Sequence, residues 1–284
     1  MPELTCFKAY DIRGEIDVNI DKGIAYRIGR AVAQHFVAKA VVIVFDARAT
    51  SPTFAAAAAW GAMDAGSNVL EIGMAGTEEM YWAVTEFGAC AGIEVTASHN
   101  PINYNGMKIV KSLSRPLEDE SEFQVIKALA ESQAWVETNK PGQEMDRATE
   151  ARRAYVDRVL SFMDVSALKP LKIVVNSGNG AAGPTFDAIA GRLDAPLEFI
   201  RVHHKPDASF PNGIPNPLLP QNHAATAKVV KETGADFGVA FDGDFDRCFF
   251  FDETGQFVPG EYVVGLLASI FIEKEATIKV TIKG

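Results

Sequence analysis

The stretch VVIVFDARATSPTFAAAAAWGAMDAGSNVLEIG, residues 41–73, decides the fold class. It begins with a continuous apolar run, residues 41–45, of the kind that forms a strand buried on both faces. Ser51-Pro52 can cap and start the alanine-rich helix that we predict over residues 53–65. The next strand is predicted at residues 68–73. A strand, a helix and a strand in this order predict a βαβ unit with a mainly parallel sheet.

The same pattern recurs further along the chain. Strands are predicted at residues 93–96, 171–175 and 236–241, and helices at residues 148–163 and 184–192. Polar loops follow these strands, as at the carboxyl edge of a parallel sheet. The sequence therefore predicts an α/β fold: two consecutive domains with mixed or parallel sheets, plus the start of a third.

The domain boundaries follow from length and from these elements. A chain of 284 residues suggests about two domains. We expect a first domain over residues 1–148, a second over 149–254, and an incomplete third over 255–284. That last part is predicted to hold a helix at 261–273 and a strand at 277–282, which cannot bury a sheet face alone. Either it completes the preceding domain, or the sequence is a C-terminally truncated piece of a longer protein.

Composition excludes several classes of protein. Hydrophobic residues make up 48% and charged residues 23%, as in a soluble globular protein with a core. The net charge of −10 and the absence of a Lys/Arg run argue against a nucleic-acid surface. The charged N-terminus is not a signal peptide, and the longest apolar stretch, residues 262–272, is far shorter than the roughly 20 residues that span a membrane. Cys6, Cys90 and Cys248 form no CxxC pair, which favours reduced thiols in a cytoplasmic protein.

The sequence DGDFDR, residues 242–247, is the strongest local chemical signal. Asp242, Asp244 and Asp246 repel one another unless a cation neutralises them or their pKa values rise. Their alternate spacing can place three oxygens around one hard cation such as Mg²⁺. An EF-hand calcium loop is disfavoured: Glu253 falls at its twelfth position, but an arginine stands where the sixth needs glycine. A solvated acidic turn is the structural alternative.

The sequence EVTASHNPINYNGMKIV, residues 94–110, is predicted to be a strand that breaks into a polar loop and then resumes. Ser98 and His99 are adjacent, and adjacent side chains rarely face each other as nucleophile and base, so a hydrolase triad is disfavoured. A serine that accepts a phosphoryl group needs cations and a metal ion around it. Lys108 lies beyond a turn predicted at Asn105-Gly106 and can return toward the loop. An ordinary polar loop remains the alternative for a serine considered alone.

Other motifs have structural interpretations that compete with functional ones. Arg13 can be a surface arginine. The sequence NSGNG, residues 176–180, can cradle a phosphate before a helix, but it matches neither known phosphate-loop pattern and a plain turn is favoured. Residues 210–217 form a rigid, turn-rich segment. His203 and His204 lack metal-ligand partners at useful spacing.

Together, the motifs resemble the α-D-phosphohexomutase family. TASHNP at residues 96–101 and DGDFDR at residues 242–247 are two independent motifs in the family's order. Four shorter motifs match in the same order: YDIRG (10–14), DAR (46–48), NGMK (105–108) and NSGNG (176–180). FKAY at residues 7–10 and the segment 183–246 look most like the bacterial phosphomannomutase branch. The resemblance covers the chain to about residue 275.

The resemblance implies roles for individual residues. The implied phosphoserine is Ser98, which would donate and recover a phosphoryl group. The implied ligands of one Mg²⁺ ion per chain are Ser98, Asp242, Asp244 and Asp246. The implied catalytic residues, among which the general base stays open, are Ser98, His99, Lys108, Arg13 and Arg247. The implied substrate-binding residues are Tyr10, Arg13, Asn100, Lys108 and Arg247.

The implied reaction interconverts mannose 6-phosphate and mannose 1-phosphate through a hexose 1,6-bisphosphate, which also acts as activator. Phosphoglucomutase or phosphoglucosamine mutase specificity is one alternative; a non-catalytic Mg²⁺-binding fragment and a metal-dependent phosphatase are others. Family members have four domains, and this chain lacks the family's Gly-Glu-Met-Ser sugar-recognition loop and its C-terminal phosphate-binding loop. Binding energy from the non-reacting phosphate would then be missing. The sequence does not predict the oligomeric state.

Overall fold

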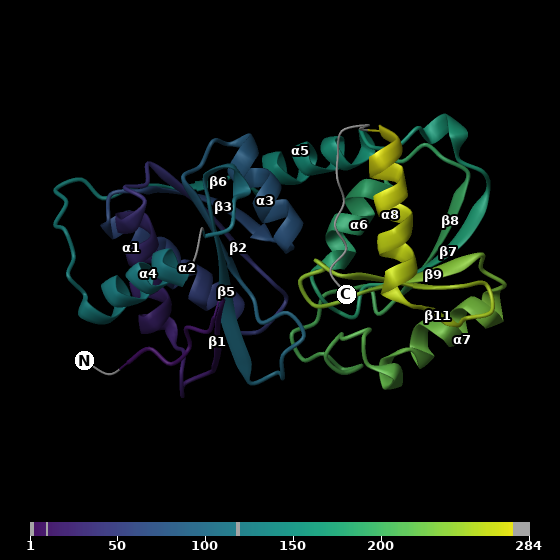
Figure 1. The fold of residues 1–284 in the computed structure, drawn as a ribbon, viewed down its shortest axis with the longest axis horizontal. Coiled ribbons are helices and arrows are strands. Elements are labelled where there is room, and N and C mark those ends of the chain that lie inside the picture. Colours follow the sequence, from purple (N-terminus) through teal and green to yellow (C-terminus); the bar gives the residue numbers. More distant parts are fainter. Residues whose placement is uncertain (1–2, 10, 118–119, 275–284) are drawn as a thin grey trace.

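The fold consists of two lobes, each a β-sheet with helices packed against it (Figure 1). A computed structural model describes residues 3–9, 11–117 and 120–274. The helix α5 (Ala148–Leu160) runs between the lobes. The predicted α/β fold class is confirmed.

The first lobe contains a six-stranded mixed sheet. Its spatial order is β1-β5-β4-β2-β3-β6. The strands are β1 (Ile12–Glu15), β2 (Ala40–Phe45), β3 (Asn68–Met74), β4 (Ala91–Val95), β5 (Tyr104–Lys111) and β6 (Glu144–Asp146). The pairings among β4, β2, β3 and β6 are parallel, as predicted, whereas β5 and β1 add two antiparallel pairings at one edge.

Helices cover both faces of this sheet. One face packs against α1 (Lys22–His35), α2 (Ser51–Asp64) and α4 (Glu120–Ser132), and the other against α3 (Thr77–Glu86) and α5. In β2, Val41 and Ile43 point into the first core cluster, and Val42 and Val44 point into the second. The apolar run of β2 is therefore buried on both faces, as its composition predicted.

The start of α2 differs from the prediction. Ser51 does not cap the helix; it is the first helical residue, and Thr50 occupies the N-cap position without a side-chain cap bond. The Ser51 hydroxyl instead donates to Asp46 Oδ1 at 2.6 Å. Pro52 lies in the first turn, where its missing N–H costs nothing. The Ser51 hydroxyl therefore hydrogen-bonds the buried Asp46 and does not cap the helix.

The second lobe contains a five-stranded sheet in the order β11-β10-β9-β7-β8. Its strands are β7 (Leu171–Asn176), β8 (Leu197–Val202), β9 (Phe237–Phe241), β10 (Cys248–Phe251) and β11 (Phe257–Val258). Its helices are α6 (Ala182–Ala190) and α7 (Ala224–Thr233), with short 3₁₀ turns at Val165–Ala167 and Pro220–Asn222; a further 3₁₀ turn, Ser112–Ser114, follows β5 in the first lobe. The pairings among β8, β7 and β9 are parallel, and β10 and β11 are antiparallel. The strands predicted at 171–175 and 236–241 are present.

In both sheets the order of the strands reverses at one strand, and this reversal determines where the loops with Ser98 and Asp242 lie. From β2 the chain crosses to β3 on one side and then to β4 on the other; from β7 it crosses to β8 and then to β9. Such a reversal opens a crevice at the carboxyl ends of the two strands, where doubly wound folds bind ligands. The loop that contains Ser98 follows β4, and the loop that contains Asp242 follows β9.

Contacts between the lobes fix these loops against each other. Glu79 of α3 is buried and accepts a hydrogen bond from Thr185 Oγ1 of α6 at 2.7 Å. Arg152 of α5 forms an ion pair with Glu79 and donates to the backbone oxygen of Met74 at 2.9 Å. Burial raises the pKa of Glu79, and Arg152 opposes that rise. Both carboxylate oxygens of the buried Glu79 thus have a partner, and this bonding fixes geometry between the helices that supply it.

The turn before α3 lies directly against the acidic loop of the second lobe. A Cβ atom on Gly76 would lie 2.4 Å from the ring of Phe245 and 2.6 Å from the backbone oxygen of Asp244. The adjacent Thr77 N–H donates to the same Asp244 oxygen at 3.3 Å. Only a residue without a side chain allows this approach.

Gly76→Ala should therefore destabilise the protein by about 1–3 kcal/mol, the usual cost of an overpacked contact. Urea unfolding would measure this, and Mg²⁺ affinity should fall as well because the acidic loop is displaced. Gly265→Ala in α8 (Gly260–Lys274) is the matched control, because nothing lies within 4 Å of its would-be Cβ. Equal effects of the two substitutions would contradict the contact's importance.

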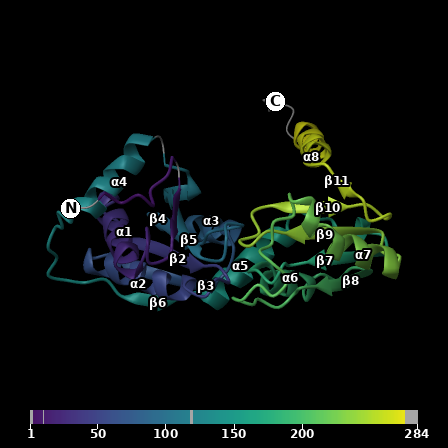
Figure 2. The ribbon, with the colours of Figure 1, turned by 90° about the horizontal axis from the view of Figure 1, so that it is seen from below.

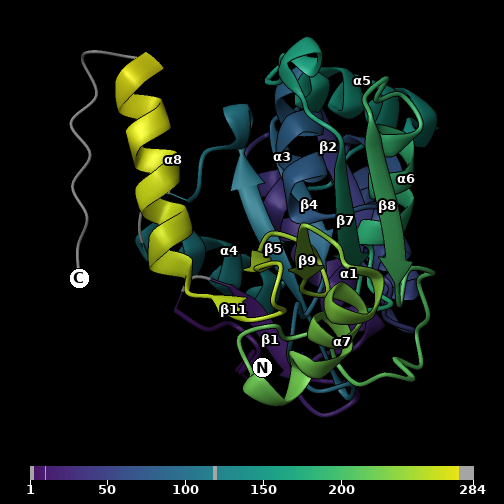
Figure 3. The same ribbon diagram turned by 90° about the vertical axis from the view of Figure 1, so that its right-hand side faces the viewer.

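The helix α8 projects away from the second lobe (Figures 2 and 3). It agrees with the helix predicted at residues 261–273, and its apolar side chains are exposed, Tyr262 at 69% and Leu266 at 61%. The strand predicted at residues 277–282 lies outside the described residues. Within the described parts of the chain, no helix combines the length and the apolar character that crossing a bilayer requires.

Candidate active site

Ser98 lies in the loop between the antiparallel strands β4 and β5 and is buried, 4% exposed. Its φ of 47° is in the left-handed region, which is uncommon for a residue with a side chain. The turn predicted at Asn105-Gly106 is wrong. Both residues are in β5, where Gly106 pairs with Arg13 of β1, so the chain reverses before Tyr104.

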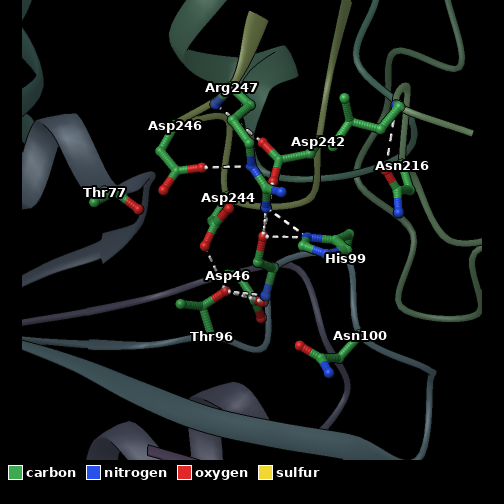
Figure 4. Close-up of polar contacts among 12 residues, drawn as sticks. Asp46, Thr77, Thr96, His99, Asn100, Asn216, Asp242, Asp244, Asp246 and Arg247 are labelled. Carbon is green, nitrogen blue, oxygen red and sulfur yellow. Dashed lines mark hydrogen bonds and ion pairs between the residues drawn. The ribbon is translucent and has the colours of Figure 1, made fainter. Parts of the chain in front are cut away.

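The Ser98 hydroxyl contacts His99 of its own lobe and Asp242 and Arg247 of the second lobe, three residues that Figure 4 shows close together. It donates to Asp242 Oδ2 at 2.7 Å and accepts a hydrogen bond from Arg247 Nη2. His99 Nδ1 lies 3.1 Å from the same oxygen. The expectation that adjacent Ser98 and His99 would not face each other is therefore wrong, because the positive φ of Ser98 turns the two side chains together.

Asp242, Asp244 and Asp246 form one cluster, in which each offers an oxygen within 4.8 Å of the others. Asp242 and Asp244 are buried, whereas Asp246 is exposed. Burial raises the pKa of Asp242 to about 7, and the neighbouring Asp244 adds to this. Burial also acts on Asp244, but Lys108, Arg13 and Thr96 together outweigh it and lower the pKa of Asp244. The cluster therefore strongly favours an added positive charge.

Lys108 reaches the cluster from β5 of the other lobe. Its Nζ donates to Asp244 Oδ2 at 2.7 Å, to Asp246 Oδ2 at 2.8 Å and to Thr77 Oγ1 at 2.8 Å. Burial opposes the ammonium charge, but Glu94, Asp244 and Asp246 outweigh burial and raise the pKa of Lys108. Lys108 is thus a cation beside the acidic cluster. Among the described residues its hydrogen bonds go to this cluster and to Thr77, whereas the sequence suggested a return toward the serine loop.

Arg247 is the second cation of the site. It forms ion pairs with Asp242 and, through Nε at 3.2 Å, with Asp246. Its Nη2 also contacts His99 Nδ1, and because a guanidinium can only donate, this nitrogen is an acceptor. Burial lowers the pKa of His99 and Arg247 lowers it further, which favours the neutral imidazole. Arg247 therefore joins the serine, the histidine and two of the three carboxylates.

The donor set fits a hard divalent cation such as Mg²⁺. Its three carboxylates supply oxygen ligands, which this ion prefers. Among the described residues, Asp244 Oδ1 is one of few buried side-chain atoms without a hydrogen-bond partner, so it has a free lone pair. The EF-hand alternative is not supported: residues Cys248–Phe251 form β10, and Glu253 is not part of the cluster.

Thr96 connects the two lobes beneath Ser98. Its Oγ1 lies 2.8 Å from Asp46 Oδ2 and 3.1 Å from Asp244 Oδ2, and it accepts the Ser98 N–H at 2.8 Å. Sequence reasoning included Thr96 and Asp46 in family motifs but gave them no role. The available signal was that Asp46 follows β2, the neighbour of β4, so both strands end at one edge.

Sequence reasoning missed Glu94 altogether. It is fully buried in β4, accepts from Thr77 Oγ1 at 2.7 Å and lies 3.9 Å from Lys108 Nζ. Its Oε1 has no hydrogen-bond partner among the described residues. Burial raises the pKa of Glu94 well above its usual value, although Lys108 opposes this. A charged residue within an apolar strand was the available signal.

Replacing Glu94 with glutamine should change how stability depends on pH. A carboxyl with a raised pKa keeps its proton in the folded state where the unfolded chain loses it, so stability falls as the pH rises above about 4.5. Glutamine has no such proton. The free energy of unfolding of Glu94→Gln should therefore rise relative to wild type as the pH rises above about 4.5, at up to about 1.4 kcal/mol per pH unit. Urea titrations at several pH values would measure the free energy of unfolding of wild type, Glu94→Gln and, as a control, the exposed Glu86→Gln. If the difference between wild type and Glu94→Gln does not change with pH, Glu94 does not have a raised pKa.

The remaining predicted site residues differ in their placement. Arg13 is buried in β1, pairs with Asp11 at 3.5 Å and donates to its neighbour's backbone oxygen, so it is not a surface arginine. The Asn100 side chain stands apart from the carboxylate cluster (Figure 4). Tyr10 lies outside the described residues.

The loop at residues 176–180 is a turn that supports the acidic loop. Its amides donate to protein oxygens: Asn179 N–H to His203 at 2.7 Å and Gly180 N–H to Ser177 at 2.9 Å. The next amide, Ala181 N–H, donates to Gly243 between two of the carboxylates, at 3.1 Å. These bonds support the structural interpretation over a phosphate cradle.

As a whole, the site combines a buried hydroxyl, two hydrogen-bond acceptors for its proton and two fixed cations beside three carboxylates. Ser98 can donate to Asp242 or to His99. Lys108 and Arg247 can neutralise an anionic group next to it. Phosphoryl transfer requires this combination of positioning and positive charge, and little covalent help from the protein.

Comparison with known proteins identifies two matching family models. Residues 5–135 match "Phosphoglucomutase/phosphomannomutase, alpha/beta/alpha domain I". Residues 153–255 match domain II of the same description. The two matches account for most of the chain.

Relatives match over nearly the whole chain. A phosphomannomutase of Salmonella montevideo is 52% identical over 99% of this chain, and one of Escherichia coli strain K12 is 50% identical over the same share. The chain spans 62% of the length of these two relatives. A solved structure of a phosphoglucomutase/phosphomannomutase family protein from Burkholderia thailandensis has a TM-score of 0.84 and 31% identity, covering 96% of this chain and 60% of that one.

Proposed function

The chain belongs to the phosphoglucomutase/phosphomannomutase family, and from this premise we propose that it takes part in the interconversion of mannose 6-phosphate and mannose 1-phosphate. The single observation that supports this most strongly is the contact between Ser98 Oγ and Asp242 at 2.7 Å. It joins the hydroxyl of one lobe to the acidic cluster of the other. The names of the relatives support mannose over other sugars.

In the proposed mechanism, Ser98 is the phosphoryl carrier. Phosphorylated Ser98 gives its phosphoryl group to the free hydroxyl of the sugar monophosphate: the new phosphorus–oxygen bond forms as the Oγ–phosphorus bond breaks, the sugar hydroxyl loses its proton, and Ser98 Oγ recovers one. The resulting hexose 1,6-bisphosphate then returns its other phosphoryl group to Ser98, whose hydroxyl loses its proton, and the released sugar oxygen recovers a proton to give the isomeric monophosphate. Residues Asp242, Asp244 and Asp246, with an oxygen of Ser98, would hold one Mg²⁺, which when bound supplies charge neutralisation at the transferring group.

The other site residues move protons or bind anions in this proposal. Asp242 and His99 both lie within hydrogen-bond distance of the Ser98 hydroxyl and can accept its proton. Lys108 and Arg247 position the phosphoryl group. Arg13, Asn100 and Tyr10 are proposed to contact the sugar phosphate.

Turnover with mannose, glucose and glucosamine phosphates, each with Mg²⁺ and hexose 1,6-bisphosphate, tests the proposal. Mannose 1-phosphate should be isomerised fastest; faster turnover of another sugar would reassign the specificity within the family. Free phosphate without isomerised sugar would indicate a phosphatase. Mg²⁺ binding without either product would indicate a non-catalytic fragment.

We further propose the division into residues 1–148, 149–254 and the remainder, which the family-model matches at 5–135 and 153–255 support. A cytoplasmic location is also proposed. The free thiols of Cys6 and Cys90 support it, because reduced cysteines are typical of that compartment.

A further inference from the structure

Arg48 holds the loop that contains Ser98. It follows β2, is only 3% exposed, and its two terminal nitrogens donate to the backbone of the neighbouring loop. The four acceptors are the carbonyl oxygens of Ser98 (3.0 Å), Asn100 (2.6 Å), Pro101 (2.9 Å) and Tyr104 (3.1 Å). All four terminal N–H groups of the guanidinium are thus used on one loop.

This arrangement is specific to arginine. A loop without regular structure needs donors for its carbonyl groups, and here one side chain supplies four. Lysine has three donors on a single nitrogen and cannot match four oxygens spread along a loop. The loop also holds Ser98 at its positive φ, a conformation that persists only when the surroundings enforce it.

Asp46 orients Arg48 and links it to Ser98 by a second route. Its Oδ1 accepts the Arg48 backbone N–H at 2.9 Å, and its Oδ2 lies 3.5 Å from Arg48 Nε. The same Oδ2 contacts Thr96 Oγ1, which accepts the Ser98 N–H. Both the carbonyl and the amide of Ser98 are therefore bonded within one network.

Phe210 of the second lobe covers the guanidinium. Its ring centroid lies 5.8 Å from Arg48 Cζ, within the range of a cation–π contact, and the side chain is buried. Phe210 belongs to the turn-rich segment 210–217, for which the proposed mechanism has no use. The contact joins Arg48 to the lobe that supplies the acidic cluster.

We propose that Arg48 is a positioning residue for phosphoryl transfer. Its guanidinium holds the loop from Ser98 to Tyr104 in the conformation that presents Ser98 Oγ to Asp242, and Phe210 holds the guanidinium in place from the second lobe. The proposal rests on the proposed function of Ser98 as phosphoryl carrier. It assigns a role to the DAR motif at residues 46–48 and to Phe210.

Two variants and a matched control test this. Arg48→Lys keeps the charge but loses the four-oxygen contact, and Phe210→Leu keeps an apolar cover but loses the ring. Arg30→Lys is the control: Arg30 also stacks on an aromatic ring, with Cζ 5.1 Å from the centroid of Trp135, but has no contact with the serine loop. The measured quantity is the rate of phosphoryl incorporation per folded molecule at saturating glucose 1,6-bisphosphate and Mg²⁺.

Arg48→Lys should slow this rate about 100-fold, the scale of a displacement of about 1 Å at a reacting group. Phe210→Leu should slow it about fivefold, and Arg30→Lys by less than twofold. A merely structural role would lower the unfolding midpoint of Arg48→Lys and leave the rate per folded molecule at the wild-type value. That result would overturn the proposal.

Hydrogen exchange separates this proposal from the proposed function. If wild type accepts no phosphoryl group, the carrier role of Ser98 fails, but the amides of residues 97–104 still report whether Arg48 orders the loop. They should exchange at least tenfold faster in Arg48→Lys than in wild type or Arg30→Lys, while amides of α1 are unchanged. Unchanged exchange in the loop would overturn the positioning role.

Discussion

Replacing Ser98 with alanine should abolish Mg²⁺-dependent phosphoryl incorporation from hexose 1,6-bisphosphate, a loss of about 10³-fold or more. The reason is chemical: the substitution removes the only atom of that side chain that can bond to phosphorus. The fold should survive, because the Ser98 backbone contacts to Arg48 and Thr96 do not involve the hydroxyl. Intact-mass spectrometry would measure the incorporated phosphoryl group.

Ser177→Ala is the matched control for this experiment. Ser177 is also a buried serine in a loop after a central strand, but its hydroxyl bonds to His204 and not to the acidic cluster. It should incorporate the phosphoryl group at close to the wild-type rate. Equal labelling of Ser98→Ala and wild type would show that another residue is the carrier.

Asp244→Asn should weaken Mg²⁺ binding by about 100-fold or more. Changes to groups that only support a metal ligand already cost 10–100-fold, and Asp244 is predicted to be a ligand itself. It is fully buried, and one of its oxygens has no partner among the described residues. The variant also loses a carboxylate opposite Lys108, whose ammonium then repels the ion more strongly. Isothermal titration calorimetry with Mg²⁺ would measure the affinity.

Glu253→Gln is the control for metal binding. Glu253 occupies the twelfth position of the rejected calcium-loop alternative, is exposed, and is not part of the carboxylate cluster. Its replacement should leave Mg²⁺ affinity unchanged. A large loss with Glu253→Gln and none with Asp244→Asn would reverse the assignment of the metal site.

Several parts of the fold were predictable from sequence because local chemistry determines them. The continuous apolar run at residues 41–45 is typical of a strand buried on both faces, and β2 has that environment. The carboxylates of residues 242–246 follow a predicted strand, and all three share one cluster. The family motifs added the link between this cluster and Ser98.

Other parts depend on tertiary packing and have no local signature. The strand β5 continues through Asn105-Gly106 because β1, about 90 residues away in sequence, pairs with it. The contact of Ser98 with His99 depends on one backbone angle. The role of Arg48 depends on where four carbonyl oxygens converge, and sequence spacing does not encode that. Glu94 is unusual as a charged residue in an apolar strand, but its partner Lys108 becomes apparent only once the strands are paired.

The central claim is that Ser98 and the acidic cluster form one metal-dependent phosphoryl site. Peptide-level mass spectrometry of the wild-type protein, treated with glucose 1,6-bisphosphate in Mg²⁺ and separately in EDTA, tests it most directly. We expect a single phosphoryl group on Ser98 in Mg²⁺, and little or none in EDTA. Phosphorylation at another residue, or equal phosphorylation of Ser98 in EDTA, would contradict it.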